Sequence, residues 1–222
     1  MTFFNLGHSV QLHFTIGHIF FVLKLNSLND KEKIMIKKLA VYLGASSDAK
    51  PQYKKDAAQV GEWMVNNNLE LVYGGSGVGL MKILSDTILD NGGKVHGVIT
   101  SQLNNRGTTN TRLKNLDIVD TMDERKLEMM NDADGMMAIP GGIGTLEEIS
   151  QAISWITLGN NAKPVAFYNY NNFYDGLHDQ ILHMHHEGFL EKRYVDAICF
   201  SDNLDEILNF MNSYQVPIRR NF

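Results

Sequence analysis

Short hydrophobic runs alternate with longer, half-polar segments along most of the chain. The runs span 39–43, 69–73, 94–99, 116–119, 135–139, 165–168 and 197–200. Each run is too short for a helix and indicates a buried strand. Apolar residues recur every three to four positions, as in helices with one buried face, over 51–67, 80–90, 122–131, 145–156, 173–187 and 204–211. Repeated strand–helix units predict an α/β fold: a Rossmann-like, doubly wound parallel sheet with helices on both faces, in a single domain.

Proline and glycine mark the ends of several of these elements. Pro51 opens the first predicted helix, where its missing N–H is harmless, and Asn91-Gly92-Gly93 ends the second. Residues 101–114 are polar and show no clear period. We therefore expect this segment to be a loop or short helical pieces, beside any site at the strand ends.

The first 37 residues do not follow this pattern. An apolar stretch at 14–25 is interrupted by His18 and Lys24 and is too short for a membrane-spanning helix. It also lacks the basic leader and small-residue cleavage site of a signal peptide. We expect residues 1–37 to be an N-terminal extension outside the fold, with a membrane anchor as the alternative. Residues 38–222 should form the domain.

Charge and cysteine usage narrow the function classes. The formal net charge of the 222 residues is −5, which argues against a broad nucleic-acid-binding surface, so any phosphate must be held by a local site. The single cysteine, Cys199, excludes an intrachain disulfide and fits a reducing compartment such as the cytoplasm. Its place in a hydrophobic run predicts a packing role.

The most informative stretch follows the predicted strand at 135–139. Pro140 should end that strand, because proline cannot donate to a sheet. We expect the three glycines of 141–144 to adopt backbone conformations closed to other residues and to lie against a ligand. A helix follows from Thr145, with Glu147 and Glu148 expected in its first turn. Free N–H groups at such a helix start form an anion site.

Four segments follow predicted strands: 44–47, 74–79, 122–126 and 141–148. Ligands of doubly wound sheets bind beyond the carboxyl ends of the strands, so these segments should meet at one edge. The glycine loop at 74–79 does not fit G-x-G-x-x-G, and the chain lacks G-x-x-x-x-G-K-[ST]. These absences argue against a dinucleotide enzyme and a P-loop NTPase.

Two motifs give the chain a resemblance to a known family. PGGIGTLEE at 140–148 resembles the P-G-G-x-G-T-x-x-E signature of the Lonely Guy (LOG) family, and MDERK at 122–126 resembles its M-H-x-R-K motif, with Asp123 in place of histidine. The resemblance extends over about 38–210 and identifies the expected protein as a cytokinin riboside 5'-monophosphate phosphoribohydrolase. Such a hydrolase of cytokinin biosynthesis releases free base and ribose 5-phosphate from an N6-substituted adenine nucleotide. The resemblance implies a cytoplasmic homodimer without a cofactor or metal.

The resemblance implies Arg125 and Glu148 as the catalytic pair. With the strand-end loops, it gives the expected substrate-binding residues: Ser46, Gly75, Ser76, Met122, Lys126, Gly141, Gly142, Ile143, Gly144, Thr145 and Glu147. Cleavage of an N-glycosidic bond builds positive charge on the ribose, which a carboxylate can stabilise while it orients water. We expect Glu148 to do this, Arg125 to hold Glu148 or the nucleotide, and the glycine turn to bind the 5'-phosphate.

Several alternatives accompany this expectation. The chain could be an AMP nucleosidase, or a non-catalytic nucleotide or molybdenum-cofactor carrier of the same fold. A lysine decarboxylase is disfavoured, because no lysine stands out as a Schiff-base residue for pyridoxal phosphate. The histidines at 178, 183, 185 and 186 lack the spacing of a metal motif and are expected on a solvated helix face. WITLG at 155–159 resembles a family segment that lines a dimer contact.

Overall fold

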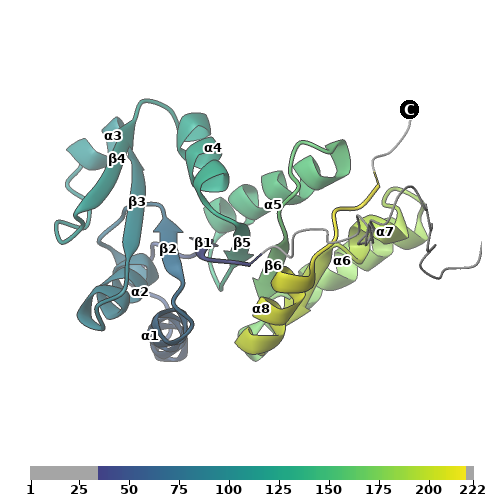
Figure 1. Ribbon diagram of the computed structural model, residues 1–222, viewed down its shortest axis with the longest axis horizontal. Helices are drawn as coiled ribbons and strands as arrows, with labels where there is room; N and C mark the ends of the chain where they lie inside the picture. Colours follow the sequence, from purple (N-terminus) through teal and green to yellow (C-terminus); the bar gives the residue numbers. More distant parts are fainter. Residues whose placement is uncertain (1–34, 219–222) are drawn as a thin grey trace, which may run out of the picture. The chain divides into compact units, whose positions relative to one another are not determined.

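A computed structural model describes residues 35–218, which contain one parallel sheet of seven strands (Figure 1). The strands are β1 (Lys38–Tyr42), β2 (Glu70–Tyr73), β3 (Val95–Thr100), β4 (Asn115–Val119), β5 (Gly135–Ala138), β6 (Val165–Tyr168) and β7 (Ile198–Ser201). Their order is β4-β3-β2-β1-β5-β6-β7, and every neighbouring pair is parallel. The predicted Rossmann-like parallel sheet is therefore confirmed.

The strand order reverses between β1 and β5, which places a topological switch point at the centre of the sheet. Tyr42 pairs with Ala138, so the two strands end at the same level. The loops that follow them then touch: the Gly44 N–H donates to the Pro140 carbonyl at 3.4 Å. This contact brings the first loop and the glycine turn together at the carboxyl edge of the sheet.

Helices cover both faces of the sheet (Figure 1). They are α1 (Pro51–Asn66), α2 (Gly79–Asp90), α3 (Ser101–Asn105), α4 (Met122–Asp132), α5 (Ile143–Leu158), α6 (Asp175–His186), α7 (Lys192–Val195) and α8 (Leu204–Ser213). Side chains of α1, α2 and α8 share one hydrophobic core with one face of the sheet. Side chains of α4 to α7 share a second core with the other face. The sheet is thus doubly wound.

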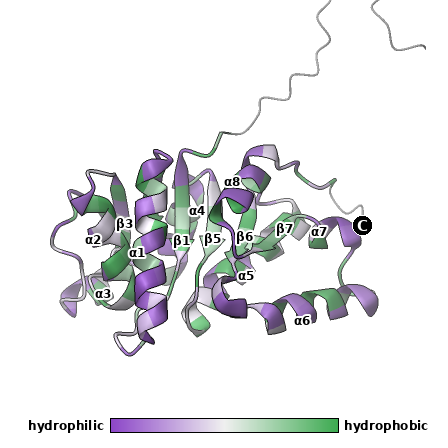
Figure 2. Cartoon of the chain, turned by 90° about the horizontal axis from the view of Figure 1, so that it is seen from below, coloured by the Kyte–Doolittle hydropathy of each residue, from purple (hydrophilic) through white to green (hydrophobic). Residues whose placement is uncertain are grey.

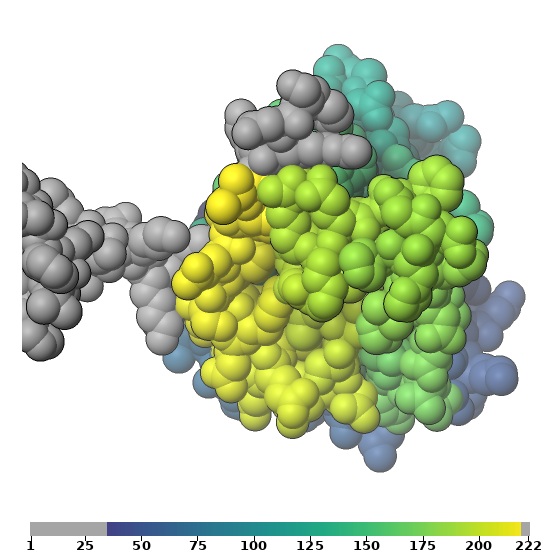
Figure 3. All heavy atoms as spheres, turned by 90° about the vertical axis from the view of Figure 1, so that its right-hand side faces the viewer, coloured from purple at the N-terminus to yellow at the C-terminus, as the bar shows by residue number. Residues whose placement is uncertain are grey.

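Hydropathy follows this layering. In Figure 2, α1 alternates between hydrophobic and hydrophilic colours along its length, as expected for a helix with one buried face. Figure 3 shows the end of the domain where α6, α7 and α8 lie at the surface. Within residues 35–218, no helix is both long and apolar enough to span a membrane.

Most predicted elements lie within about two residues of the observed ones. The helix after the glycine turn begins at Ile143, two residues before the predicted Thr145. The prediction that Glu147 and Glu148 lie in its first turn is therefore wrong, and both lie in the second. The four-residue α7 was not predicted, because one turn gives no periodic signal.

The predicted domain boundary is late. Ile36 is 6% exposed and belongs to the core beneath α1, α2 and α8, and its N–H donates to Asn212 Oδ1 at 3.0 Å. Ordered packing therefore begins at least two residues before the predicted start at Lys38. Residues 1–34 of the predicted extension at 1–37 lie outside the described residues, as does its membrane-anchor alternative.

Cys199, His178 and His185 make ordinary packing contacts. Cys199 is half-buried in β7, and burial raises the pKa of its thiol to about 11, which disfavours the thiolate. His178 stacks on Phe200 with ring centroids 4.6 Å apart, and His185 Nδ1 lies 2.8 Å from the Leu190 carbonyl. Among the described residues, no group of three histidines, cysteines or carboxylates is arranged to hold a metal ion.

A buried histidine lies between two carboxylates at the opposite, amino edge of the sheet. His96 Nδ1 is 2.8 Å from Asp132 Oδ2, and its Nε2 is 2.7 Å from Asp117 Oδ2. Only a protonated imidazole can donate to both partners. Burial lowers the pKa of His96, but the hydrogen bonds and charges of the two aspartates outweigh it and raise the pKa above its usual 6.5. When protonated, the histidine therefore ties β3, β4 and α4 together.

This arrangement predicts a pH-dependent contribution to stability. A raised folded-state pKa stabilises the protein fully below the unfolded-state value, and the contribution is lost as pH rises through the folded-state pKa. We expect wild type to exceed His96→Gln in free energy of unfolding by more at about pH 5.5 than at about pH 9. Urea unfolding at both pH values measures this difference. A difference that stays constant or grows with pH would contradict a stabilising contact between protonated His96 and the two aspartates.

Candidate active site

A cavity of about 320 Å³ opens at the switch point, a volume typical of small-ligand sites. Its lining comes from the loops after β1 and β2, from the helices α2, α3 and α4, from the segment that follows α3, and from the start of α5. The lining residues are Leu43, Gly44, Ala45, Gly74, Ser76, Val78, Met81, Leu103, Thr108, Arg125, Gly142, Gly144, Thr145 and Glu148. All four segments predicted to meet at this edge contribute to the cavity.

Arg125 and Glu148 form a buried ion pair in this cavity. Arg125 Nη1 donates to Glu148 Oε1 at 2.9 Å, and the two side chains are 6% and 7% exposed. Arg125 Nε donates to the Val98 carbonyl at 3.0 Å, which fixes the guanidinium against β3. Burial raises the pKa of Glu148, and the charge and hydrogen bond of Arg125 oppose this effect. Residues 23 positions apart in sequence thus share one wall of the cavity.

Local sequence explains how Arg125 reaches this place. Thr121 and Glu124 form a capping box: Thr121 Oγ1 accepts from the Glu124 N–H at 3.1 Å, and Glu124 Oε2 accepts from the Thr121 N–H at 3.0 Å. The box starts α4 directly after β4, so Arg125 lies in the first turn and faces the sheet. Glu124 is therefore used in capping.

Gly74 makes room for the guanidinium. A Cβ atom added at this position would lie 1.7 Å from Arg125 Nη2 and 2.9 Å from Arg125 Cζ. Both distances are far below van der Waals contact, so any larger residue here must displace Arg125. The glycine is required for this close approach between the end of β2 and a side chain of α4.

The glycines at 141, 142 and 144 are explained by the space around them and not by unusual backbone dihedrals. Positive φ values occur at six described glycines, but not at 141, 142 or 144. The expectation that these three adopt conformations closed to other residues is therefore wrong. A Cβ at Gly141 would lie 2.2 Å from Thr145 Oγ1, so this glycine permits a close backbone approach. Gly142 and Gly144 have open space in front of them and line the cavity, where side chains would occupy ligand volume.

The start of α5 faces this cavity. Its N-cap residue is Gly142, and no side chain caps the helix. The first N–H groups of an α-helix have no partner within the helix, and the helix dipole makes this end positive. The cavity therefore has anion-binding groups at the glycine turn and a buried carboxylate one turn further along α5.

The structure divides the predicted site residues into three sets. Those that line the cavity are Ser76, Arg125, Gly142, Gly144, Thr145 and Glu148. Ser46 and Gly141 line a neighbouring hollow of about 390 Å³, which shares Gly44 and Gly142 with the cavity. The remaining five line neither space: Gly75, Met122, Lys126, Ile143 and Glu147.

Four of these five residues form ion pairs, face solvent or form a turn. Lys126 Nζ pairs with Glu147 Oε1 at 2.6 Å and with Asp123 Oδ1 at 3.1 Å, so its charge is already neutralised. The Ile143 side chain is 82% exposed. Gly75 has a φ of +69° and forms the tight turn after β2.

Met122 contacts the catalytic candidate instead of the cavity. Its Sδ lies 3.3 Å from Arg125 Nη1, so Met122 touches the guanidinium from outside.

Sequence reasoning missed two residues of the cavity wall, Leu103 and Thr108. Both lie in the segment 101–114, which was correctly expected beside the site, but its lack of a period gave no indication of which residues face the cavity. Val78 and Met81 also line the cavity, because the glycine loop continues directly into α2. Val78 lies in the predicted loop segment 74–79, whereas no motif in the sequence marked Met81, Leu103 or Thr108.

Solved structures of two molybdenum-cofactor proteins share the fold. The molybdenum cofactor binding protein from Rippkaea orientalis superposes with a TM-score of 0.59 at 19% identity, covering 80% of this chain and 96% of that one. The molybdenum cofactor carrier protein MCP from Chlamydomonas reinhardtii gives 0.58 at 13% identity, covering 78% and 94%. At these identities the likeness shows the fold alone.

Sequence comparison is more specific. A family model described as "Possible lysine decarboxylase" matches residues 81–211. Cytokinin riboside 5'-monophosphate phosphoribohydrolase LOG2 of Arabidopsis thaliana is 36% identical over 193 residues, which are 87% of this chain and 90% of that protein. The rice enzyme of that name, LOG of Oryza sativa subsp. japonica, is 40% identical over 139 residues, 63% of this chain and 57% of that protein. The chain therefore belongs to the Lonely Guy family, together with the cytokinin riboside 5'-monophosphate phosphoribohydrolases.

Proposed function

We propose that the protein hydrolyses the N-glycosidic bond of a purine riboside 5'-monophosphate, releasing free base and ribose 5-phosphate. The preferred substrate in this proposal is an N6-substituted adenine nucleotide, since the relatives are named for cytokinin riboside monophosphates. The observation that carries the proposal is the buried Arg125–Glu148 pair in a cavity at an uncapped helix start. It joins an anion site to a carboxylate in a space of nucleotide size.

In this proposal Glu148 acts on the ribose. As the bond to the base breaks, positive charge develops on the sugar, and a nearby carboxylate stabilises it. The same carboxylate can orient or deprotonate the attacking water. The charge of Arg125 opposes the rise in the pKa of Glu148 that burial causes, and its hydrogen bond at 2.9 Å orients the carboxylate. The N–H groups at the start of α5 bind the 5'-phosphate and thereby place the sugar.

A decarboxylase function has no support in the cavity. No lysine is among the described residues that line it, and Lys126 points instead to Glu147 and Asp123. The hydrogen bond to Glu147 is the largest cause that raises the pKa of Lys126, which disfavours the neutral amine that a Schiff base requires.

Product analysis tests the proposal against its rivals. We expect the purified protein to convert isopentenyladenosine 5'-monophosphate to free base and ribose 5-phosphate, with lower kcat/KM for AMP. Adenosine, which lacks the phosphate, should react at least about 100-fold less efficiently, because remote binding energy positions the reacting bond. Liquid chromatography of the base measures all three substrates.

The rivals predict other outcomes. Preference for AMP would indicate an AMP nucleosidase. Binding without turnover of either nucleotide, by a folded protein, would contradict the enzyme and favour a carrier.

We also propose a cytoplasmic homodimer. A hollow at the end of α5 is lined by Leu158 and Phe189, whose side chains are 53% and 82% exposed. Two exposed apolar side chains that line one hollow offer a contact for a second copy of the chain. Light scattering of the purified protein measures the mass of the assembly, and cell fractionation tests the location.

A further inference from the structure

The segment after α3 forms a wall of the cavity by lying across the glycine loop of β2. The Gly77 N–H donates to the Thr108 carbonyl at 2.6 Å, and the Asn110 N–H donates to the Gly75 carbonyl at 3.0 Å. Ser76 and Thr109 form an isolated antiparallel bridge between the two segments. Because Ser76 and Thr108 both line the cavity, this wall consists of two loops that are hydrogen-bonded to each other.

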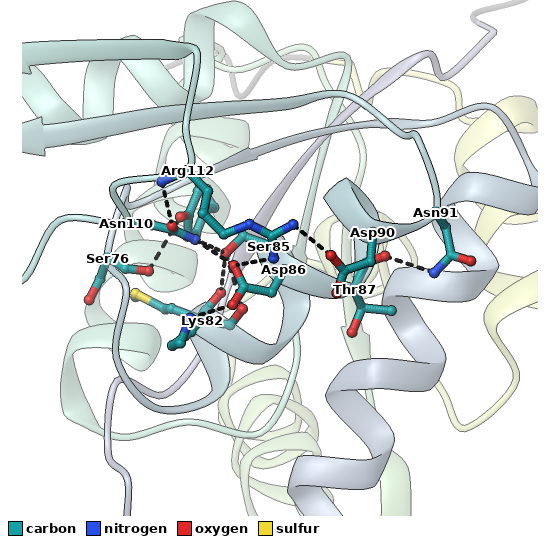
Figure 4. Close-up of polar contacts among 11 residues, drawn as sticks. Ser76, Lys82, Ser85, Asp86, Thr87, Asp90, Asn91, Asn110 and Arg112 are labelled. Atoms are coloured by element: carbon teal, nitrogen blue, oxygen red, sulfur yellow. Dashed lines mark hydrogen bonds and ion pairs between the residues drawn. The ribbon is translucent and has the colours of Figure 1, made fainter.

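Asn110 fastens this wall to α2 (Figure 4). Its side chain is buried, and Nδ2 donates to Ser85 Oγ at 2.9 Å and to Asp86 Oδ1 at 3.0 Å. Its Oδ1 accepts from the Arg112 N–H at 3.0 Å. The amide therefore uses both its donor and acceptor groups, in a place where water cannot replace them.

The packing at this point leaves little freedom. A Cβ atom at Gly77 would lie 3.0 Å from Asn110 Cα, so the two loops touch backbone to backbone. Ser85 is fully buried, and its hydroxyl donates to the Met81 carbonyl at 2.9 Å while it accepts from Asn110. Met81 itself lines the cavity. Asn110 thus connects α2 to the cavity wall through contacts that exclude solvent.

Most charged groups around Asn110 are exposed. Arg112 pairs with Asp90, and their side chains are 42% and 63% exposed (Figure 4). The partly buried Asp86 pairs with the exposed Lys82 and with Arg112. Exposed ion pairs contribute little to structure, so the buried amide is the main fastening.

The catalytic pair is held separately. Arg125 is fixed by Val98 on β3 and by Glu148 on α5, and neither contact involves residues 106–114. A loosened wall would therefore leave the ion pair in place while it disturbs the part of the cavity that Ser76 and Thr108 form.

We propose that Asn110 is a positioning residue for nucleotide binding. It keeps the wall of Ser76 and Thr108 in its binding geometry before the nucleotide arrives, so it acts on substrate affinity and not on bond cleavage. This inference rests on the proposed function, because the ligand is the nucleotide of that site. A preformed wall lowers the entropy lost on binding.

The test separates KM from kcat. We expect Asn110→Ala to raise KM for isopentenyladenosine 5'-monophosphate about tenfold and to change kcat by less than about twofold, the pattern of lost uniform binding. Trypsin should also cleave the folded variant faster after Arg106 and Arg112, two exposed sites in the wall. Asp90→Asn, at the exposed end of the same network, is the matched control and should leave KM, kcat and cleavage unchanged.

If Asn110→Ala does not fold, a second pair of variants provides the test. Asn110→Asp removes the donor and places a carboxylate against Asp86, so KM should rise as in the alanine variant. Combining Asn110→Asp with Asp86→Asn exchanges donor and acceptor across the contact to position 86, and the Ser85 hydroxyl can turn to donate to the new carboxylate. The double variant should restore KM to within about threefold of wild type.

An unchanged KM with a reduced kcat, or no rescue by the exchange, would overturn the positioning role. The trypsin readout needs no turnover. An inactive wild type would therefore contradict the proposed function, whereas unaltered cleavage of the variant would contradict this inference.

Discussion

Replacing Glu148 by glutamine is expected to lower kcat for isopentenyladenosine 5'-monophosphate by about 10²–10⁴-fold, the usual contribution of a catalytic acid or base. Glutamine matches the shape of glutamate but cannot stabilise developing positive charge or accept a proton from water. Because the glycine turn and Arg125 remain, AMP should bind within about threefold of the wild-type affinity. Steady-state kinetics and calorimetry measure the two effects separately.

Glu128→Gln is the matched control, since it makes the same chemical change on the exposed side of α4. It should leave kcat unchanged. In the wild type, burial raises the pKa of Glu148 above its usual 4.5, so kcat/KM should fall as pH drops through this raised value. A Glu148→Gln variant that retains most of its turnover would remove this carboxylate from the mechanism.

Replacing Gly74 by alanine is expected to cost both activity and stability. The added methyl group would lie 1.7 Å from Arg125 Nη2, so the guanidinium must move away from Glu148. A carboxylate left buried without its partner costs about 3–5 kcal/mol. We expect the free energy of unfolding to fall by about this amount and kcat to fall by at least about 100-fold, since Glu148 loses its orientation. Urea unfolding and kinetics on the same preparation measure both.

Gly176→Ala serves as the control for this substitution. Gly176 lies in α6, and an added Cβ there meets no atom within 4 Å. Alanine should stabilise that helix by about 0.5–1 kcal/mol. If Gly74→Ala is as stable and active as wild type, the guanidinium does not depend on the close approach that the structure shows.

Much of the fold could be predicted because each strand carries its own signal. The runs at 39–43 and 135–139 are nearly all apolar, as expected for central strands that are buried on both faces. Arg125 and Glu148 could be predicted to converge because each follows a parallel strand, and parallel strands end at one edge. The resemblance to the Lonely Guy family supplied their roles, which spacing alone did not give.

The remaining errors have physical causes. The resemblance implies Lys126 as a substrate-binding residue, but in the structure it does not line the cavity, since adjacent residues of a helix point in directions about 100° apart. Lys126 therefore meets Glu147 while Arg125 meets Glu148. The segment 101–114 was correctly expected beside the site, but the contacts of Thr108 and Asn110 within it could not be predicted, because they join loops without periodicity. The role of Gly74 depends on one side chain of a distant helix, which no local pattern reveals.

The most direct test of the central claim is a crystal structure of Glu148→Gln with AMP bound. The account predicts the phosphate on the N–H groups at the start of α5 and ribose C1' within about 4 Å of the side chain at position 148. It also predicts that the wall of Ser76 and Thr108 keeps its present place. A nucleotide bound with C1' turned away from this side chain, or bound outside the cavity, would contradict the account.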